Sequence, residues 1–452
     1  MSDEGNDNTP GPTPTKKILT PSCETKPAGD AKGKKSKKDR PEPTTFGGKL
    51  WYHWVKPIGS VIIVVVVFRS MLFDWNDVPT GSMEPEVHVG DRIAVNRLAY
   101  GLQFPLTGPQ IGIPFIGPQF DNPLDGVPQI AWGNGPARGD IVTFWNPVTK
   151  VRMVKRIVAV PGDTIEMTGG ELIINGERAT YQDVPANPPT MPVQTKWAVE
   201  GAMGRTQYKT AEVAYREETI LGETRVVQHI KDRWQDGVQL VELNNGTRGT
   251  LSGGVVTAVD FLSNRRAEQV PLAQYLNNNP QPTVFAEMRN GAIYIDGERA
   301  SFSDLAEAML AGFADGSRAD LLAKAGLSVD GHTFQVEGKA VSMDIFETRF
   351  KTEAPSIAKT DAEKQIVNQM HQTLNFLGNA TMTNYGPVTL GEDEYLMIGD
   401  NRNNSHDGRR FGPVDRGEIT GEAFAVAFSF EDNKMFALPP DPAWNRFFKG
   451  LD

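Results

Sequence analysis

The stretch VRMVKRIVAV at residues 151–160 is one of six short apolar runs that predict the fold. Gly, Pro and Asn-Gly pairs separate these runs along the chain, as turns separate strands. The other five runs are DRIAVNRLAY (91–100), DIVTFW (140–145), ELIING (171–176), YLMIGD (395–400) and EAFAVAFSF (422–430). The pattern predicts a mainly β protein built on antiparallel sheets.

Lys155 stands out within the first run because its neighbours are apolar. Strand alternation predicts that Lys155 shares a face with Met153 and Ile157. Arg156 would then take the opposite and wetter face. A lysine considered alone is ordinarily a surface residue, so this pattern does not assign a role by itself.

Ser82 stands out in VPTGSMEPEVHVGDRIAV at residues 78–95. Gly81 precedes it, and Pro79 and Pro85 restrict the backbone on either side. We therefore expect the hydroxyl in a rigid, exposed turn. Considered alone, Ser82 would be read as an ordinary turn serine.

Composition argues against several classes of function. The 452 residues carry a net charge of −10, which disfavours nucleic acid as a partner, because phosphate binding needs a basic face. The single cysteine, Cys23, excludes a disulfide framework and a Cys-rich metal site. The six histidines show no HExxH spacing. We therefore expect no metal and no cofactor.

The N-terminal region predicts a membrane anchor. Residues 1–50 have the composition of a disordered tail, and AKGKKSKKDR at 31–40 holds six Lys or Arg against one Asp. The apolar stretch WYHWVKPIGSVIIVVVVFRSMLF follows at 51–73 and can cross ~30 Å of hydrocarbon at ~1.5 Å per residue. The positive-inside rule predicts a cytoplasmic tail and extracytoplasmic residues 74–452.

Two alternatives exist for residues 51–73. One is a buried Val-rich strand, which the basic tail and the flanking aromatic residues disfavour. The other is a cleaved signal peptide, which the long N-terminal region and the lack of a small-residue cleavage site disfavour.

A sequence repeat lies in a long region between about 170 and 390. GELIINGERATYQD at 170–183 and GAIYIDGERASFSD at 291–304 share seven of fourteen residues. The Asn-Gly and Asp-Gly pairs predict a hairpin in each copy. We interpret the repeat as a duplicated β-element, with chance similarity as the alternative.

Helices are expected in the same region. One covers 303–313 and begins with a serine cap. Another covers 360–378, where Thr360 and Glu363 form a capping box and Gly378 provides the C-terminal stop. Its apolar residues lie on one face and predict packing, namely Ile366, Met370, Leu374 and Leu377.

Two segments are left with open or dispensable roles. The Pro/Gly-rich loop at 102–137 is apolar and lies either against a bilayer or on the protein core. Residues from about 230 to 385 contain none of the motifs below, so we expect them to be dispensable for chemistry.

The ordered motifs together resemble bacterial type I signal peptidase, a family of Ser/Lys-dyad serine proteases. The resemblance covers roughly 51–101, 137–183 and 389–430. It rests on RSMLFDWNDVPTGSMEP, GDRIAVNRLAYG, ARGDIVTFW, VRMVKRIVAVPGD and IGDNRNNSHDGRRFGPV. It implies an antiparallel β-sheet catalytic domain of the signal-peptidase type, behind one transmembrane helix, with an inserted β/α region at about 170–390.

The resemblance also implies the roles of the site residues. Ser82 would be the nucleophile and Lys155 the general base. The Thr80 hydroxyl and the Ser82 backbone N–H would form the oxyanion hole. Ser405 would hydrogen-bond and orient the Lys155 amine. Two further residues, Asp407 and Arg409, would brace the site as an ion pair, in one loop with Asp400, Asn401 and Arg402.

Three positions depart from the family's usual pattern. Thr80 stands where the family usually has Ser, although its hydroxyl can make the same hydrogen bond. Asn403 and Gly408 stand where well-known members have Asp and Ser. The finer contacts of that loop are therefore not transferred.

The implied chemistry needs a neutral lysine. Lowering the pKa from ~10.4 by ~3 units costs ~4 kcal/mol, which burial among apolar side chains can supply. The amine would take the Ser82 proton, and the acyl-enzyme would be hydrolysed by water. Implied partners are secretory preproteins with Ala-x-Ala-type cleavage sites, the bilayer of a bacterial inner membrane and the translocation machinery.

Three other functions remain as alternatives. A Ser-His-Asp hydrolase would use Ser82 and Asp407 with His88 or His406. A self-cleaving Ser/Lys protease of the repressor-like group is another, although those proteins are soluble. A membrane-tethered binding module without activity is the third, and the presence of both Ser82 and Lys155 disfavours it.

Overall fold

The computed structural model divides the chain into two units, Met1–Val61 and Ile62–Asp452. Residues 1–44 of the predicted tail, Cys23 among them, lie outside the described residues. The described residues are 45–102, 110–111, 120–121, 130–131, 135–187, 191, 194–200, 206–230, 239–243, 248–252, 255–258, 268–289, 292–310, 323–331, 333–430 and 442–451.

The predicted anchor segment is helical. Three helical segments follow one another without a gap: α1 (Phe46–Leu50), the π-helix η1 (Trp51–Val55) and α2 (Lys56–Met71). The Val-rich strand considered for this segment is therefore wrong. Within the described part of the chain, no single helix combines the length and apolar character needed to span a membrane.

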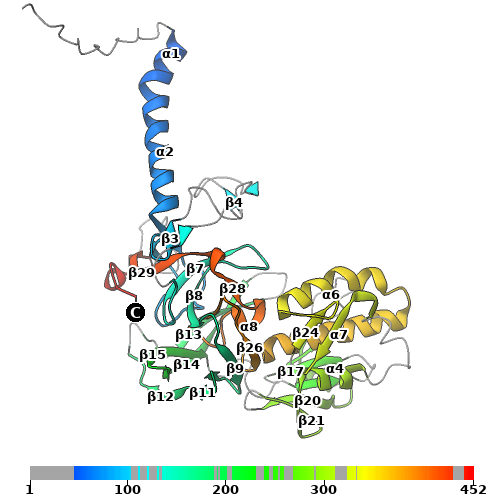
Figure 1. Cartoon of the computed structure of the whole chain (residues 1–452). Coiled ribbons are helices and arrows are strands. Elements are labelled where there is room, and N and C mark those ends of the chain that lie inside the picture. The colour runs from blue at the N-terminus through cyan, green and yellow to red at the C-terminus, as the bar shows by residue number, and fades with distance from the viewer. Residues whose placement is uncertain are drawn as a thin grey trace, which may run out of the picture. The chain divides into compact units, whose positions relative to one another are not determined.

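A seven-stranded antiparallel sheet carries the residues of interest (Figure 1). Its order is β1-β2-β29-β7-β8-β27-β28. The bounds are β1 (Phe73–Asp77), β2 (Asp91–Asn96), β7 (Ile141–Trp145), β8 (Arg152–Ala159), β27 (Glu394–Ile398), β28 (Val414–Asp415) and β29 (Ile419–Ser429). Strands distant in sequence are neighbours here, so the sheet joins residues from both ends of the folded region.

Apolar side chains of this sheet belong to three buried clusters, and two of these contain side chains of β7. One contains Val142, Phe144 and Ile157, and the other contains Ile93 and Ile141. The turn segment that holds Ser82 contributes Val78, Met83 and Val87 to the second cluster. Burial of these three side chains fixes the turn against the sheet.

Two smaller sheets follow in the chain. The order of one is β11-β10-β9-β26, with β9 (Thr164–Thr168), β10 (Glu171–Ile174), β11 (Glu177–Arg178) and β26 (Tyr385–Thr389). The other joins β12 (Thr180–Val184), β13 (Gln194–Glu200), β14 (Thr206–Ile220) and β15 (Glu223–Ile230), with β14 paired to the other three. Below, β14 and β15 are called the inserted hairpin, because they lie in the region at about 170–390 that is predicted from the sequence to be inserted.

The rest of the insertion contains sheets and helices. A second seven-stranded sheet has the order β19-β18-β17-β16-β20-β21-β22. Its strands are β16 (Gln239–Glu242), β17 (Arg248–Ser252), β18 (Val255–Ala258), β19 (Glu268–Pro271), β20 (Thr283–Arg289), β21 (Ala292–Ile295) and β22 (Glu298–Ala300). A three-stranded sheet comprises β23 (Leu327–Asp330), β24 (Thr333–Val336) and β25 (Lys339–Val341).

Helices and four two-residue strands make up most of the remaining described elements. The helices are α3 (Leu272–Tyr275), α4 (Phe302–Leu310), α6 (Met343–Ile357), α7 (Asp361–Ala380), α8 (Gly408–Phe411), η3 (Arg416–Glu418) and η5 (Trp444–Arg446). Two-residue strands β3 (Gly101–Leu102), β4 (Gln110–Ile111), β5 (Phe120–Asp121) and β6 (Ile130–Ala131) form two pairs, β3-β6 and β4-β5. Most of the 102–137 loop lies outside the described residues, so its two interpretations stay open.

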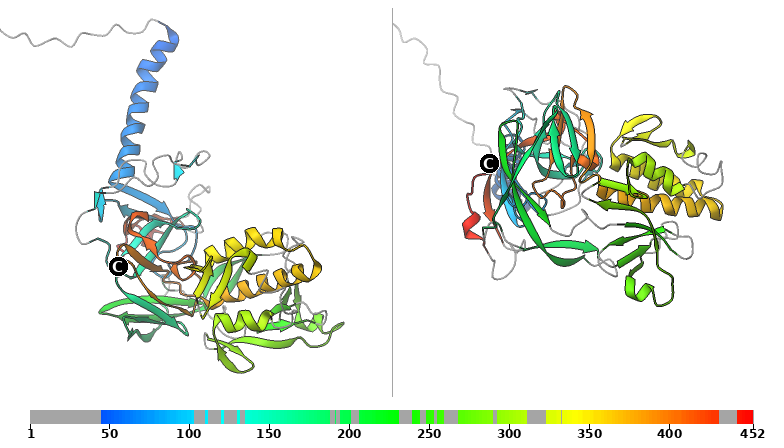
Figure 2. Two further views of the ribbon diagram at one scale, coloured as in Figure 1. Left: turned by 45° about the vertical axis from the view of Figure 1, so that its right-hand side comes forward. Right: turned by 90° about the horizontal axis from the view of Figure 1, so that it is seen from below.

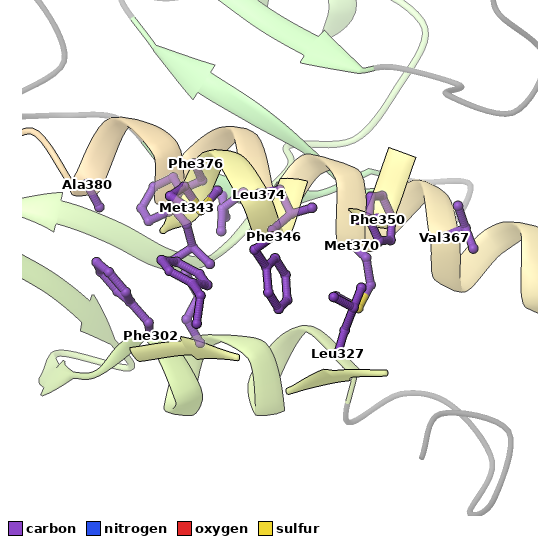
Figure 3. Close-up of a cluster of buried hydrophobic side chains, with 14 of the residues drawn as sticks. Phe302, Leu327, Met343, Phe346, Phe350, Val367, Met370, Leu374, Phe376 and Ala380 are labelled. Carbon is purple, nitrogen blue, oxygen red and sulfur yellow. The ribbon is translucent and has the colours of Figure 1, made fainter. Parts of the chain in front are cut away.

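The later part of the insertion has a hydrophobic core of its own. Phe302 of α4, Phe346 of α6 and Leu374 of α7 meet in one buried cluster (Figure 3). Figure 2 shows α4, α6 and α7 grouped with the strands around β20–β22. All four predicted apolar residues of the 360–378 helix belong to this cluster, which confirms that they pack.

Both copies of the repeat form hairpins. The first copy folds as β10–β11 and the second as β21–β22. The turn pairs Asn175-Gly176 and Asp296-Gly297 all have positive φ, between 51° and 86°, as the Asn-Gly and Asp-Gly signals predict. The copies then diverge, because the first continues into strand β12 and the second into helix α4.

Two helix boundaries differ from the predicted ones. Helix α4 begins at Phe302, and Ser301 Oγ caps it by accepting the Asp304 N–H at 3.2 Å. Residues 311–313 lie outside the described residues. Helix α7 has the predicted capping box, with Thr360 Oγ1 accepting the Glu363 N–H at 3.2 Å.

Gly378 does not stop helix α7, which continues to Ala380. A β-carbon at Gly378 would clash with the guanidinium of Arg410. The glycine therefore provides space for an arginine from the 400–410 segment rather than a helix end. With these corrections, the predicted mainly β, antiparallel fold is confirmed. That the region at about 170–390 is an insertion stays a prediction.

Candidate active site

Ser82 lies in the segment that joins β1 to β2 and is only 8% exposed. The exposed turn expected from its prolines is therefore wrong. Asn401 lies against this segment and binds two adjacent backbone carbonyls in it. Asn401 Nδ2 donates to Gly81 O at 2.8 Å, and Asn401 N donates to Ser82 O at 3.2 Å.

Lys155 lies on β8 and its amine reaches Ser82. Lys155 Nζ donates to Ser82 Oγ at 2.8 Å and to Val154 O at 2.8 Å. Lys155 is 3% exposed, and this burial lowers the pKa of its amine from 10.5 to about 8. The nearby Asp407 and Asp400 carboxylates raise the pKa but do not cancel the effect of burial.

These two side chains can exchange a proton. An amine with a pKa of about 8 is substantially neutral in mildly alkaline solution. At 2.8 Å it lies within the distance that a general base needs from the hydroxyl it deprotonates. The sequence motifs that carry Ser82 and Lys155 are 73 residues apart, and only the sheet brings them together.

Strand alternation predicted that Arg156 lies on a solvent-exposed face of β8, and this prediction is wrong. Arg156 is 4% exposed, and its Nη2 lies 2.9 Å from Asp400 Oδ2. The opposite face of β8 is covered by the Asp400 segment, so both faces are buried at this point. The sequence did not reveal this, because a strand with one wet face and a strand with two covered faces can share the same alternation.

The two hydrogen bonds described for the Lys155 amine go to Ser82 and Val154, so the expected bond from Ser405 stays a prediction. The Ser405 hydroxyl is buried and hydrogen-bonds to the Asp407 carboxylate, which helps to lower the pKa of Asp407. Ser405 also lies close to the nucleophile segment, because a β-carbon at Gly399 would clash with both Ser405 Oγ and Ser82 O. Gly399 thus allows the two serines to approach each other.

Asp407 and Arg409 form the expected ion pair. Arg409 Nη2 lies 2.7 Å from Asp407 Oδ2, and both side chains are at most 1% exposed. Burial raises the pKa of Asp407, but the Arg409 guanidinium outweighs it and holds that pKa below its usual value. Asp407 also accepts the Gly399 N–H at 3.1 Å, which ties the pair to the backbone beside Ser82.

The departures from the family's pattern fit their surroundings. Asn403 Oδ1 accepts the Ile230 N–H at 2.8 Å, and its Nδ2 donates to Ile230 O at 2.7 Å. A carboxylate has no donor for the second bond. At Gly408, a β-carbon would lie 2.8 Å from Leu396 Cδ1 and 2.9 Å from Met397 O, so serine would not fit without a shift.

Thr80 is exposed and lies two residues before Ser82. Its position places a hydroxyl on the solvent side of the nucleophile segment. The role in an oxyanion hole stays a prediction.

The two histidines proposed for a triad have other partners. His88 Nε2 lies 2.9 Å from Pro85 O, and burial lowers its pKa to about 4. His406 Nε2 lies 2.8 Å from Asp344 Oδ2 on helix α6. Asp407 is paired with Arg409, so the described contacts provide no Ser-His-Asp relay.

The insertion contacts this region at several points that the motifs did not reveal. Arg410 Nη2 lies 3.0 Å from Asp344 Oδ1 and 2.6 Å from Glu347 Oε2. Arg409 Nη1 donates to Met382 O at 2.6 Å. That residues from about 230 to 385 are dispensable therefore stays a prediction, and their removal would leave two arginines with fewer partners. No motif signals these contacts, because they join distant segments.

The described residues contain no group of three or more His, Cys, Asp or Glu side chains that is placed to hold a metal ion.

The chain is similar to known signal peptidases. It is 34% identical to signal peptidase I of Pseudomonas aeruginosa over 144 residues, which are 31% of this chain and 44% of that protein. It is 33% identical to signal peptidase I of Pseudomonas fluorescens over 144 residues, with the same two shares. Identity to signal peptidase I of Bacillus licheniformis is 27% over 139 residues, 31% of this chain and 58% of that protein.

The chain thus spans less than half the length of the two Pseudomonas relatives. The family described as "Signal peptidase, peptidase S26" matches residues 51–225 and 286–428. Those two segments make up more than half of the chain and contain Ser82, Lys155, Ser405, Asp407 and Arg409. The chain therefore belongs to the peptidase S26 family of signal peptidases.

Proposed function

We propose that this protein is a membrane-anchored serine endopeptidase that removes signal peptides from secretory preproteins with a Ser82/Lys155 dyad. The observation that carries the proposal is the 2.8 Å between Lys155 Nζ and Ser82 Oγ, in a buried site where the pKa of the lysine is about 8. The relatives' shared name, signal peptidase I, supports the class of substrate.

In the acylation step, the Ser82 oxygen attacks the carbonyl carbon of the scissile peptide bond while neutral Lys155 takes the hydroxyl proton. The tetrahedral intermediate then collapses, and the carbon–nitrogen bond breaks. Lys155 gives its proton to the leaving amine, and the acyl group remains on Ser82 as an ester.

In the deacylation step, a water molecule attacks the ester carbonyl and Lys155 takes a proton from that water. The ester bond breaks, Ser82 regains its proton from Lys155, and the carboxylic acid product leaves. The Thr80 hydroxyl and the Ser82 N–H would donate to the developing oxyanion, each worth roughly 3 kcal/mol. No cofactor takes part in these steps.

Burial and the nearby carboxylates of Asp400 and Asp407 together set the pKa of Lys155. The carboxylates raise the pKa of Lys155, and burial lowers it further than they raise it. Only the unprotonated amine accepts a proton, so activity should increase as the pH rises through about 8.

The decisive experiment uses detergent-solubilised protein and a preprotein whose signal ends in Ala-x-Ala. Wild-type protein should release the mature chain, and Ser82→Ala should not. A substrate with Phe instead of Ala at the P1 position should be cut far more slowly, since the Ala-x-Ala-type sites that the resemblance implies have small side chains at P1 and P3. Failure of the wild type on every such substrate would favour a binding module, and equal cleavage of the Ala and Phe substrates would refute the specificity.

The anchor at residues 51–73 and the bacterial inner membrane belong to the same proposal. The supports are the apolar sequence, the basic tail before it and the uninterrupted helical segments from Phe46 to Met71. In intact spheroplasts, added protease should digest residues 74–452 and spare an N-terminal tag. Protection of the folded region with loss of the tag would show the opposite topology.

A further inference from the structure

Glu218 is a buried carboxylate that the dyad does not use directly. It lies on β14 of the inserted hairpin and is 0% exposed. Pairing places Tyr181 opposite Glu218 on β12, and Arg225 opposite it on β15. Tyr181 Oη donates to Glu218 Oε2 at 2.9 Å, and Arg225 Nε donates to Oε1 at 2.9 Å.

The strongest partner of Glu218 comes from outside its sheet. Arg402, 4% exposed, donates from Nη1 to Oε2 and from Nη2 to Oε1 at 2.7 Å, a two-pronged pairing with fixed geometry. Burial alone would raise the pKa of Glu218, but Arg402 and Arg225 hold it below its usual value. The carboxylate is therefore charged across the working range of the enzyme.

The backbone of the inserted hairpin also pairs with the segment around Arg402. Arg402 N donates to Gln228 O at 2.8 Å, and Gln228 N donates to Asp400 O at 2.8 Å. Asn403 binds both backbone groups of Ile230 through its side chain. Residues 400–403 are thus held along β15 as if they were one more strand.

Three of these four residues also reach the surroundings of the dyad. Asp400 pairs with Arg156, the neighbour of Lys155 on β8. Asn401 binds the carbonyls of Gly81 and Ser82. The carbonyl of Arg402 accepts from Arg409 Nη2 at 2.7 Å, and Arg409 in turn pairs with Asp407.

We propose that Glu218 is a positioning residue for the Ser82/Lys155 dyad, and that it acts by fixing Arg402 and thereby the 400–403 segment between the inserted hairpin and the two catalytic side chains. The inference rests on the proposed function. It makes the inserted hairpin part of the catalytic scaffold through Arg402 and not through a contact of Glu218 with the dyad.

The test compares Glu218→Gln with Glu217→Gln in the full, detergent-solubilised chain on a peptide with Ala at P1 and P3. Glu217 is the preceding residue on β14, pairs with Gln182 and Val226, and is partly exposed. Glu218→Gln keeps the size of the side chain but leaves two buried guanidinium groups without a carboxylate. The matched Glu217→Gln change removes one charge from the neighbouring position on the same strand.

For Glu218→Gln we expect kcat to fall about 10²-fold with little change in KM, since small displacements of catalytic groups have effects of that size. The midpoint of the pH–rate profile should also move above about 8, because a loosened 400–403 segment admits water to Lys155 and weakens the effect of burial. Glu218→Asp, which keeps the charge, should recover part of the rate. Glu217→Gln should match the wild type in both respects.

A purely structural role would lower the amount of folded enzyme without moving that midpoint. An unchanged midpoint in folded Glu218→Gln, with activity in proportion to folded protein, would therefore overturn the proposal. If Glu218→Gln does not fold, Arg402→Lys replaces it, since an ammonium cannot hold both carboxylate oxygens in the same geometry. The same rise of the midpoint is then expected, and its absence overturns the proposal.

Failure of the proposed function itself would be visible separately. A wild-type protein that does not cleave the peptide refutes the function and leaves the positioning of Lys155 to be measured directly. The rate at which acetic anhydride acetylates Lys155, followed against pH by mass spectrometry, reports the pKa of its amine. An identical titration in wild type and Glu218→Gln would overturn the inference in that case.

Discussion

Replacing Lys155 with Met should make the protein inactive and, at neutral pH, more stable. The folded amine has a pKa of about 8 because it is buried, against 10.5 for an ordinary lysine. Keeping it charged in the folded state at pH 7 therefore costs about 3 kcal/mol of the free energy of unfolding. Met fills a similar volume without a charge, so this cost disappears.

The sign of the pH dependence follows from proton binding. Between pH about 8 and 10.5, the unfolded chain holds a proton on Lys155 that the folded protein does not. The stability of the wild type therefore rises with pH through this window and is lowest, in this respect, below about 8. From the same two pKa values, the cost falls from about 3 kcal/mol at pH 7 to about 1 kcal/mol at pH 9.5.

Lost hydrogen bonds reduce the gain. Lys155 donates to Ser82 Oγ and to Val154 O, and each such bond contributes about 1 kcal/mol. The net gain at pH 7 is therefore about 1 kcal/mol. The loss of these hydrogen bonds depends little on pH. The change with pH is therefore the better test: the difference in the free energy of unfolding between the two proteins should decrease by about 2 kcal/mol between pH 7 and 9.5.

The assay is urea-induced unfolding of wild type and Lys155→Met in detergent at both pH values, with peptide cleavage measured on the same samples. Lys339→Met, at an exposed position of β25, controls for the loss of a lysine as such. A difference in the free energy of unfolding between wild type and Lys155→Met that stays constant with pH would refute the reasoning. It would mean that burial does not destabilise the charged form of Lys155. A less stable variant at pH 7 would refute the reasoning as well.

The remaining predictions concern activity and use the same cleavage assay. Lys155→Arg should be inactive because a guanidinium cannot be deprotonated in this range, whereas His406→Ala should keep most of its rate; the reverse pattern would replace the dyad with a triad. Thr80→Ala should lose roughly 10²–10³-fold in kcat, and Thr80→Ser should lose little, if the hydroxyl donates to the oxyanion. The wild-type pH–rate profile should have its midpoint near 8, and a midpoint near ~6.5 would indicate a histidine base. Replacing residues 231–380 with a Gly-rich linker, which keeps Met382 O for Arg409, should leave measurable activity. A folded but wholly inactive product would show that this region is needed for chemistry.

Local sequence signals correctly predicted the turns and caps that depend only on residues close together in the sequence. The Asn175-Gly176 and Asp296-Gly297 turns formed as expected, because their conformation depends on the turn residues themselves. The capping box at Thr360 formed for the same reason. Local signals failed where a residue from a distant segment makes the contact. Gly378 was predicted to end a helix, yet it provides space for the Arg410 side chain.

A third hairpin shows the limit of pattern matching. The turn between β24 and β25 uses Glu337-Gly338, with φ of 52° and 76°, and helix α6 begins shortly after it, capped by Ser342. The arrangement parallels β21–β22 followed by α4. Glutamate is a weaker turn signal than Asn or Asp, so the sequence did not reveal it.

The sequence by itself determined the mainly β fold and the segments that carry Ser82 and Lys155, because strand pattern and ordered motifs are properties of short stretches. Only the tertiary structure decided that Lys155 Nζ lies 2.8 Å from Ser82 Oγ, and that both faces of β8 are covered. It also decided that Glu218, in a region with no recognised motif, holds Arg402. Burial and ion pairing depend on what distant segments place around a side chain, and a lysine's pKa of about 8 follows from that burial rather than from its neighbours in the sequence.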